Sequence, residues 1–114
     1  MTVADLEFRA GCGTENVALF TDLYGLTMAQ AYVADGICDH EATFSSYFRT
    51  LPKNRNYLLA CGLDTVLSYL EGLRFNDDAI AYLSTLERFT PAFLKWLRHF
   101  QFSGEVRAVR EGTP

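Results

Sequence analysis

The dipeptide Thr90-Pro91 constrains the fold of this chain more than any other local feature, because it marks the start of a helix. A threonine hydroxyl can accept a free backbone N–H of the first turn, and proline suits the first helical position, where no N–H is required. The residues that follow place apolar side chains at helical spacing. These are Phe93, Leu94, Trp96, Leu97 and Phe100.

Three further segments have the pattern of helices. One runs from about Thr21 to Ala34, with Gly36 as its C-terminal stop. Its predicted inward face holds Leu23, Leu26, Thr27, Gln30 and Val33. A second runs from about Leu63 to Gly72, and a third begins at Asn76 or Asp77, whose side chains can cap it. Their apolar stripes are Leu63, Val66, Leu67 and Leu70 in the second helix, and Ile80, Leu83 and Leu86 in the third.

Three other segments have the pattern of strands. Residues 42–49 alternate in polarity, which predicts that Phe44 and Phe48 face the core. Residues 57–61 form a short apolar run that predicts a buried strand, and residues 104–110 predict a final one. Residues 51–56 between the first two are expected to form a loop, because Pro52 disfavours a helical conformation at Leu51. The predicted fold class is therefore α/β (α+β), with a mixed sheet and helices.

The bulk composition predicts one globular unit. The chain has 114 residues, of which 49% are hydrophobic, enough for a modest core. We expect residues 1–16 to be an extended or mobile lead-in and residues 17–114 to form the globular unit. The apolar runs are far shorter than the roughly 20 residues that span a bilayer, so no membrane span is expected. The N-terminus has no basic region followed by an apolar core, so it does not resemble a secretory signal, and we expect a cytoplasmic protein.

The charge argues against a nucleic-acid-binding domain, and the cysteine spacing argues against a metal-binding domain. The net charge is −4 and the basic residues are scattered, which argues against a nucleic-acid-binding domain. Cys12, Cys38 and Cys61 are widely spaced and have no CxxC motif, so we expect free thiols and no metal site. The neighbouring acids Asp77 and Asp78 are better explained by helix capping than by metal binding.

The stretch from Leu19 to Met28 is the part of the sequence that most clearly indicates a functional site. It places an acid, an aromatic and two hydroxyls in an otherwise apolar helical segment. If Thr21 caps this helix, Asp22 lies where the helix dipole favours negative charge, and Tyr24 lies near the exposed helix start. A helix buried for packing alone would not need this mixture.

This stretch resembles the Thr-Asp-Leu-Tyr-x-x-Thr-Met signature found near the N-terminus of nicotinate phosphoribosyltransferases. Later stretches resemble the same family in the same order, and the resemblance runs from about Ala18 to the last residue. They are Tyr47-Phe48-Arg49 with Pro52, Arg55-Asn56-Tyr57-Leu58, Ala60-Cys61-Gly62-Leu63, residues 69–75, Pro91-Ala92-Phe93-Leu94, Phe102-Ser103-Gly104, and Glu111-Gly112-Thr113-Pro114.

The resemblance implies that residues 17–114 are a partial N-terminal domain and that the chain is the N-terminal part of a longer enzyme. In the family, the turn at 111–114 continues into the rest of the N-terminal domain and then into a large α/β barrel, which this chain lacks. The family makes nicotinate mononucleotide and pyrophosphate from nicotinate and phosphoribosyl pyrophosphate, with ATP hydrolysis, in NAD salvage. The resemblance also implies ATP and Mg²⁺ for the full enzyme, neither held by this part, and a homodimer with a shared active site. We expect the isolated chain to be inactive, and the alternative is a non-catalytic α/β interaction module derived from such an enzyme.

Three residues are candidate substrate-binding residues, and none is a candidate catalytic residue. Tyr24 matches the family tyrosine that stacks on the nicotinate ring from the neighbouring subunit, and its alternative role is a core residue on the helix face. Asp22 could orient a ligand or simply complement the helix dipole. Arg49 could contact a phosphate or an interface, or be a solvated arginine at the end of a strand.

Other polar residues receive no such role. Lys53 and Arg55 lie in a loop that is Gly-rich in many family members, so the departure leaves a substrate role for this loop in doubt. The family's phosphorylated histidine lies much further along the chain. Neither His40 nor His99 lies in the matching motif, so that role is assigned to neither.

Overall fold

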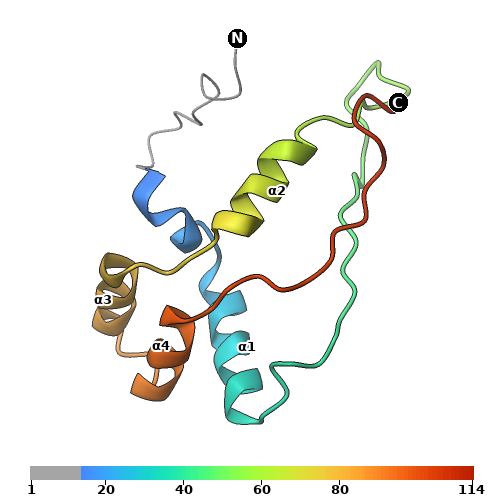
Figure 1. The fold of residues 1–114 in the computed structure, drawn as a ribbon. Coiled ribbons are helices and arrows are strands. Elements are labelled where there is room, and N and C mark those ends of the chain that lie inside the picture. Colours follow the sequence, from blue (N-terminus) through green and yellow to red (C-terminus); the bar gives the residue numbers. More distant parts are fainter. Residues whose placement is uncertain (1–13) are drawn as a thin grey trace. The chain divides into compact units, whose positions relative to one another are not determined.

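A computed structural model describes residues 14–114, with side chains from residue 17 onward. Its elements are a 3-10 helix η2 (Thr14–Leu19) and the α-helices α1 (Leu23–Ala34), α2 (Leu63–Gly72), α3 (Asp77–Thr85) and α4 (Pro91–Arg98) (Figure 1). The predicted lead-in, residues 1–16, lies outside the described residues except for its last three, which begin η2. Cys12 also lies outside them, whereas Cys38 and Cys61 are exposed free thiols, as predicted.

The chain divides into two compact units, which are described separately. The helical unit comprises residues up to Asp39 together with Leu73–Gln101, and it contains η2, α1, α3 and α4. The extended unit comprises His40–Gly72 and Phe102–Pro114, and it contains α2. Within residues 14–114, no helix is long and apolar enough to cross a membrane.

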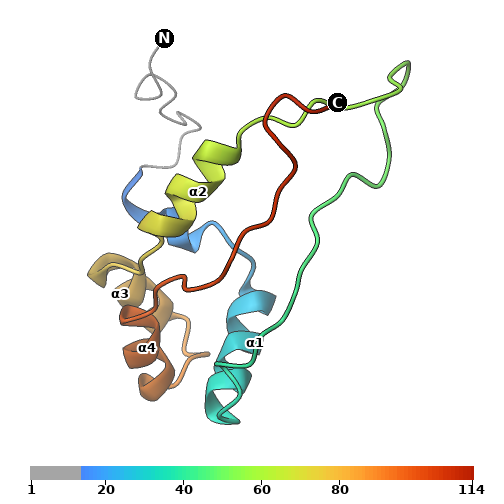
Figure 2. The same cartoon turned by 45° about the vertical axis from the view of Figure 1, so that its right-hand side comes forward.

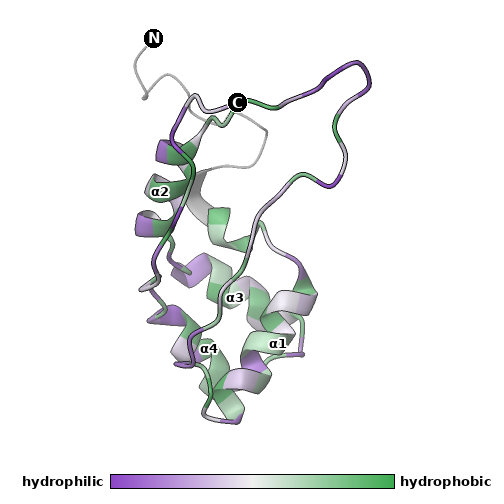
Figure 3. Ribbon diagram, turned by 90° about the vertical axis from the view of Figure 1, so that its right-hand side faces the viewer, coloured by the Kyte–Doolittle hydropathy of each residue, from purple (hydrophilic) through white to green (hydrophobic). Residues whose placement is uncertain are grey.

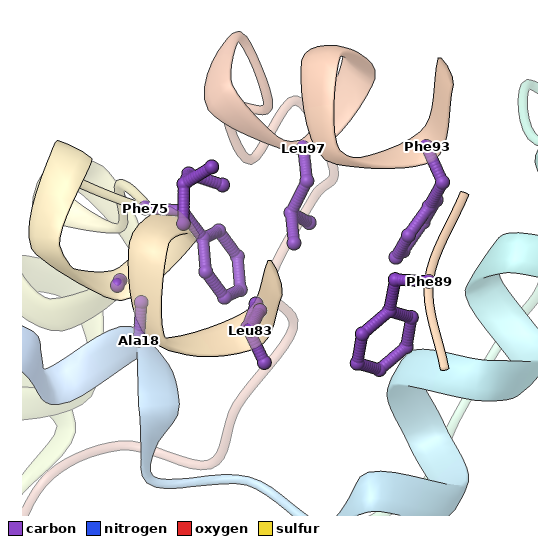
Figure 4. Close-up of a cluster of buried hydrophobic side chains, with 8 residues drawn as sticks. Ala18, Phe75, Leu83, Phe89, Phe93 and Leu97 are labelled. Carbon is purple, nitrogen blue, oxygen red and sulfur yellow. The ribbon is translucent and has the colours of Figure 1, made fainter. Parts of the chain in front are cut away.

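The core of the helical unit forms where α3, α4 and η2 meet. Phe93 and Leu97 leave α4 on the same side and lie over Leu83 of α3 (Figure 4). Phe93 is 1% exposed and its ring packs 5.6 Å from that of Phe89, measured between centroids. Among residues 17–114, the buried set is Ala18, Phe75, Ala79, Ile80, Leu83, Phe89, Phe93 and Leu97. The stripe predicted for α4 is thus confirmed at its two innermost positions.

Local capping explains where these helices begin and end. The side chain of Asn76 accepts the backbone N–H of Ala79, and Thr90 accepts that of Phe93, so both predicted caps are confirmed. At the end of α1, the N–H groups of Gly36 and Ile37 bond to the carbonyls of Val33 and Tyr32. Gly36 has a φ of +69°, so this is the left-handed helix stop that its sequence position predicts.

The α1 helix differs from the other helices of its unit because it is apolar all round. Its 12 residues include no charged side chain, and none of them is buried. Leu26, Ala29 and Val33 pack against the core only in part. A helix that is apolar on all sides usually packs against other elements on all sides. In this chain α1 leaves apolar surface exposed that such packing would bury.

The prediction of a mixed sheet is wrong. Within residues 14–114 the structure contains no strand, and the segments before α2 and after α4 are drawn as irregular coil (Figures 1 and 2). Phe44 is 90% exposed and Phe48 is 78% exposed, so neither faces a core. Tyr57 of the predicted buried strand is 65% exposed and Val109 of the predicted last strand is also 65% exposed.

The physical reason is the absence of ladders between these segments. Alternating polarity says which side of a strand would be apolar, but a strand exists only when a neighbour accepts and donates its backbone hydrogen bonds. Ala60 does bond to the chain end, donating to the carbonyl of Thr113 at 2.8 Å and accepting from Gly112 at 2.8 Å. This contact, two bonds at a single residue, is too short to form a sheet.

The α2 helix begins at Leu63, directly after Gly62, whose φ is +97°. Its hydrophobic and hydrophilic residues lie on different sides (Figure 3). Leu67 and Leu70 of the predicted stripe line a shallow crevice together with Phe102 and Val106. None of the residues of α2 is buried, and Val66 is 49% exposed.

Candidate functional site

Asp22 is the residue that starts α1. It has an extended backbone, with φ −86° and ψ 153°, and its Oδ1 accepts the backbone N–H of Gly25 at 2.5 Å. The expected cap, Thr21, is therefore wrong. Both residue types can cap, but the helix begins at Leu23, which places Asp22 immediately before it.

The sequence around Asp22 favours this carboxylate cap. A Cβ atom at Gly25 would lie only 3.3 Å from Oδ1 of Asp22, so glycine leaves room for the close approach. The negative charge also interacts favourably with the positive end of the helix dipole. Within the described part of the chain, Oδ2 of Asp22 has no hydrogen-bond partner and remains available to another group.

Tyr24 lies on the side of α1 that faces away from the core. It is nine residues before Val33, which corresponds to a rotation of about 180° around the helix axis. Its residue exposure is 73%, and its backbone carbonyl accepts the Thr27 hydroxyl at 2.9 Å. Tyr24 is therefore not part of this chain's core, and its ring is free to contact a ligand or a partner.

Other apolar side chains are exposed near the start of α1. Phe20 is 75% exposed and Leu23 is 40% exposed. Together with Tyr24, they flank the Asp22 carboxylate in the sequence. The helix start thus combines a negative charge with exposed aromatic rings, a mixture suited to recognising a flat polar ring.

Arg49 belongs to the extended unit, whereas Asp22 and Tyr24 belong to the helical unit. Its side chain is exposed, and within residues 14–114 its guanidinium has no ion-pair partner. The strand that was expected to end at Arg49 does not form. The structure thus brings Asp22 and Tyr24 together on one helix start, and it shows Arg49 as an exposed residue of the other unit.

The remaining polar candidates have local roles. Residues 52–55 form a turn in which the Arg55 N–H bonds to the Pro52 carbonyl at 3.1 Å, and Asn54 has a φ of +64°. The loop predicted there is confirmed. His99 is the C-cap of α4, with Nδ1 2.8 Å from the carbonyl oxygen of Lys95. Among the described residues, no group of three or more His, Cys, Asp or Glu side chains could hold a metal ion.

Two long-range polar contacts were not predicted from the sequence: that of Glu111 with the backbone of Gly62 and Leu63, and that of Gln30. Gln30 was placed on the inward face of its helix, but no role was given to its amide. In the structure this amide bonds to two backbone groups of the loop before α4. A glutamine on an otherwise apolar inward face was the signal that could have indicated it.

Residues 19–114 match the family model described as the nicotinate phosphoribosyltransferase (NAPRTase) N-terminal domain. The chain is 47% identical over 96 residues to nicotinate phosphoribosyltransferase pncB2 of Mycobacterium tuberculosis (strain ATCC 25618 / H37Rv), covering 84% of this chain and 20% of the relative. It is 38% identical over 73 residues to nicotinate phosphoribosyltransferase of Bacillus subtilis (strain 168), covering 64% of this chain and 15% of the relative.

The human nicotinate phosphoribosyltransferase is 35% identical over 98 residues, covering 83% of this chain and 18% of the relative. The chain therefore belongs to the nicotinate phosphoribosyltransferase family and corresponds to its N-terminal domain. It spans about a fifth of the length of the curated relatives it matches.

Proposed function

We propose that this chain supplies the ring-stacking part of an enzyme that makes nicotinate mononucleotide and pyrophosphate from nicotinate and phosphoribosyl pyrophosphate, in NAD salvage. The observation that carries the proposal is the start of α1, where Tyr24 is 73% exposed beside the capping carboxylate of Asp22. Both residues fall within the region that matches the family's N-terminal domain.

The chemistry explains the residue types. The reaction must hold a flat, electron-poor ring in line with the ribose carbon and bind several phosphates. Tyr24 offers a ring whose stacking on nicotinate contributes about 0.5–1.5 kcal/mol beyond burial. Asp22 orients a substrate or partner group through its second carboxylate oxygen. Arg49 provides a planar, permanently charged fork for a phosphate.

The surface of α1 supports a homodimer with a shared active site. The helix carries no charged residue and buries none of its side chains in this chain. A second subunit that covers this helix would remove its exposed apolar surface from water. Tyr24 of one subunit would then stack on nicotinate held by the other. We place this dimer in the cytoplasm.

We propose ATP and Mg²⁺ as co-substrate and ion of the full enzyme, and we assign neither to a residue of this chain. Mg²⁺ is commonly held by one or two carboxylates together with substrate phosphates, and the described residues contain no group of three candidate ligands that would by itself mark its site. ATP hydrolysis would supply free energy for turnover. The role of residues 19–114 is to bind and orient the pyridine ring.

The second candidate function is a non-catalytic interaction module. The exposed aromatic residues of the extended unit favour it, because such residues commonly mark protein contacts. Phe44, Tyr47 and Phe48 are 90%, 71% and 78% exposed. In this alternative, Tyr24 contacts a protein partner and the chain takes no part in phosphoribosyl transfer.

A product assay distinguishes the two functions. The full natural protein is incubated with nicotinate and phosphoribosyl pyrophosphate, with and without Mg-ATP, and nicotinate mononucleotide is quantified. The enzyme proposal expects product that requires both substrates and forms faster with ATP. Absence of product above a no-enzyme control, from protein with a cooperative thermal transition, would support the interaction module.

A further inference from the structure

The side-chain amide of Gln30 joins α1 to the loop between α3 and α4. Its Oε1 accepts the backbone N–H of Thr90 at 2.7 Å, and its Nε2 donates to the backbone carbonyl of Arg88 at 3.2 Å. These two bonds connect residues 60 and 58 positions apart in the chain. The oxygen and the nitrogen of the same planar amide therefore both form hydrogen bonds with the loop backbone. One accepts and the other donates, as the C=O and N–H groups of a backbone segment do.

The loop that Gln30 contacts contains a strained residue next to Arg88. Glu87 has a φ of +52°, a left-handed conformation that is unfavourable for a residue with a side chain. Thr90 is also the N-cap of α4, accepting the N–H of Phe93. Gln30 thus binds the backbone of the residue whose side chain starts the helix carrying Phe93 and Leu97, two innermost core residues.

Among the described residues, two kinds of contact join α1 to the rest of the helical unit, apolar packing and the two bonds of Gln30. Leu26, Ala29 and Val33 give α1 only partly buried apolar contacts with the core, and such contacts are not directional. Hydrogen bonds are directional, so two bonds from one amide resist rotation of the helix about its axis. Tyr24 lies on the same helix, about 9 Å along the axis and about 120° around it. A rotation of α1 would therefore move the Tyr24 ring directly.

We propose that Gln30 is a positioning residue for Tyr24: by clamping the backbone of Arg88 and Thr90, it sets the rotation of α1 and so the direction in which the Tyr24 ring is presented. The inference rests on the proposed function only for its consequence, the recognition of nicotinate. The clamp itself is defined by the two hydrogen bonds, and it can be measured without any substrate.

Two substitutions remove the clamp to different extents. Gln30→Met keeps the length of the side chain and removes both hydrogen bonds. Gln30→Glu keeps an acceptor for the Thr90 N–H but cannot donate to the Arg88 carbonyl while it is ionised, so its effects should be intermediate. Gln101→Met is the matched control, because Gln101 is an exposed glutamine outside the four α-helices.

The measurements are made on the full natural protein. In Gln30→Met we expect the Thr90 amide to exchange with solvent roughly three- to tenfold faster, as loss of one hydrogen bond allows. We also expect the KM for nicotinate to rise severalfold while kcat stays nearly constant, because positioning of the ring is impaired and the chemical step is not. Gln101→Met should change neither quantity.

Three results would overturn the inference. The first is unchanged Thr90 exchange in Gln30→Met, which would show that there is no clamp. The second is an unchanged KM in Gln30→Met when Tyr24→Ala raises KM; Gln30 then does not position Tyr24, and the proposed function stands. The third is an unchanged KM in both variants, which removes the stacking role of Tyr24 and with it the reason for positioning it.

Discussion

The carboxylate of Glu111 caps the start of α2 by accepting the backbone N–H of Gly62, which lies 49 residues earlier in the chain. Its Oε1 accepts the Gly62 N–H at 2.8 Å and its Oε2 accepts the Leu63 N–H at 3.2 Å. A residue distant in sequence thus does what an N-cap usually does locally. The bonds between Ala60 and residues 112–113 place this carboxylate beside the helix start.

Glu111→Ala should weaken the start of α2. Loss of a helix cap costs about 0.5–2 kcal/mol, so we expect faster amide exchange at Gly62, Leu63 and the first turn of the helix. Glu105→Ala is the control, because the Glu105 carboxylate pairs with Arg107 on the surface and contributes little. Equal exchange at Leu63 in wild type and Glu111→Ala would contradict the capping role.

Glu87→Gly should stabilise the helical unit. Glu87 follows the end of α3 with a φ of +52°, where a side chain costs about 1 kcal/mol and glycine costs little. We expect Glu87→Gly to raise the midpoint of thermal unfolding, whereas Glu87→Ala should leave it nearly unchanged because alanine keeps the strain. A lower midpoint for the glycine variant would show that the Glu87 side chain is itself stabilising.

Phe93→Ala and Phe44→Ala make the same chemical change at opposite extremes of burial. Phe93 is 1% exposed and packs with Phe89 and Trp96, so its removal should cost about 3–5 kcal/mol through the cavity it leaves. Phe44 is 90% exposed, so its removal should change stability by less than about 0.5 kcal/mol. Chemical denaturation of both variants measures the difference. Similar losses would mean that Phe44 is buried in solution.

The 114-residue chain by itself should not form nicotinate mononucleotide. The site residues that we propose supply one stacking ring and one phosphate contact, whereas the reaction must bind several phosphates and stabilise charge separation. A coupled assay with this chain alone, compared with a no-enzyme control, measures this. Product above the control would require that the chain contains a complete site.

Helix boundaries could be predicted from the sequence where the signal is local. The caps Asn76 and Thr90 and the stop at Gly36 act on backbone groups within about one turn, so a short stretch of sequence is enough. Thr21 shows the limit of this reasoning. It stands next to Asp22, both side chains can cap, and only the position of the first helical residue decides between them.

The strands and the long-range contacts could not be predicted in the same way. The alternation around Phe44 and Phe48 describes one segment, but a sheet depends on which second segment pairs with it. Likewise, Gln30 and Glu111 bond to backbone groups about 50–60 residues away in sequence. The place of Gln30 on an apolar face could have indicated that it makes a polar contact, but nothing near either residue identifies its partner. The candidate site resembles the helix caps in depending on residues that are neighbours in sequence, since Asp22 and Tyr24 lie two residues apart on one helix start.

The central claim is that Tyr24 recognises nicotinate, and paired measurements of nicotinate affinity and thermal stability on Tyr24→Ala and Tyr24→Phe in the full natural protein test it most directly. We predict that Tyr24→Ala weakens nicotinate binding by about 1–2 kcal/mol with almost no change in the melting temperature, because Tyr24 is 73% exposed in this chain. Tyr24→Phe should be much milder, because it keeps the aromatic face. A large loss of stability in Tyr24→Ala, with unchanged affinity per folded molecule, would contradict the claim.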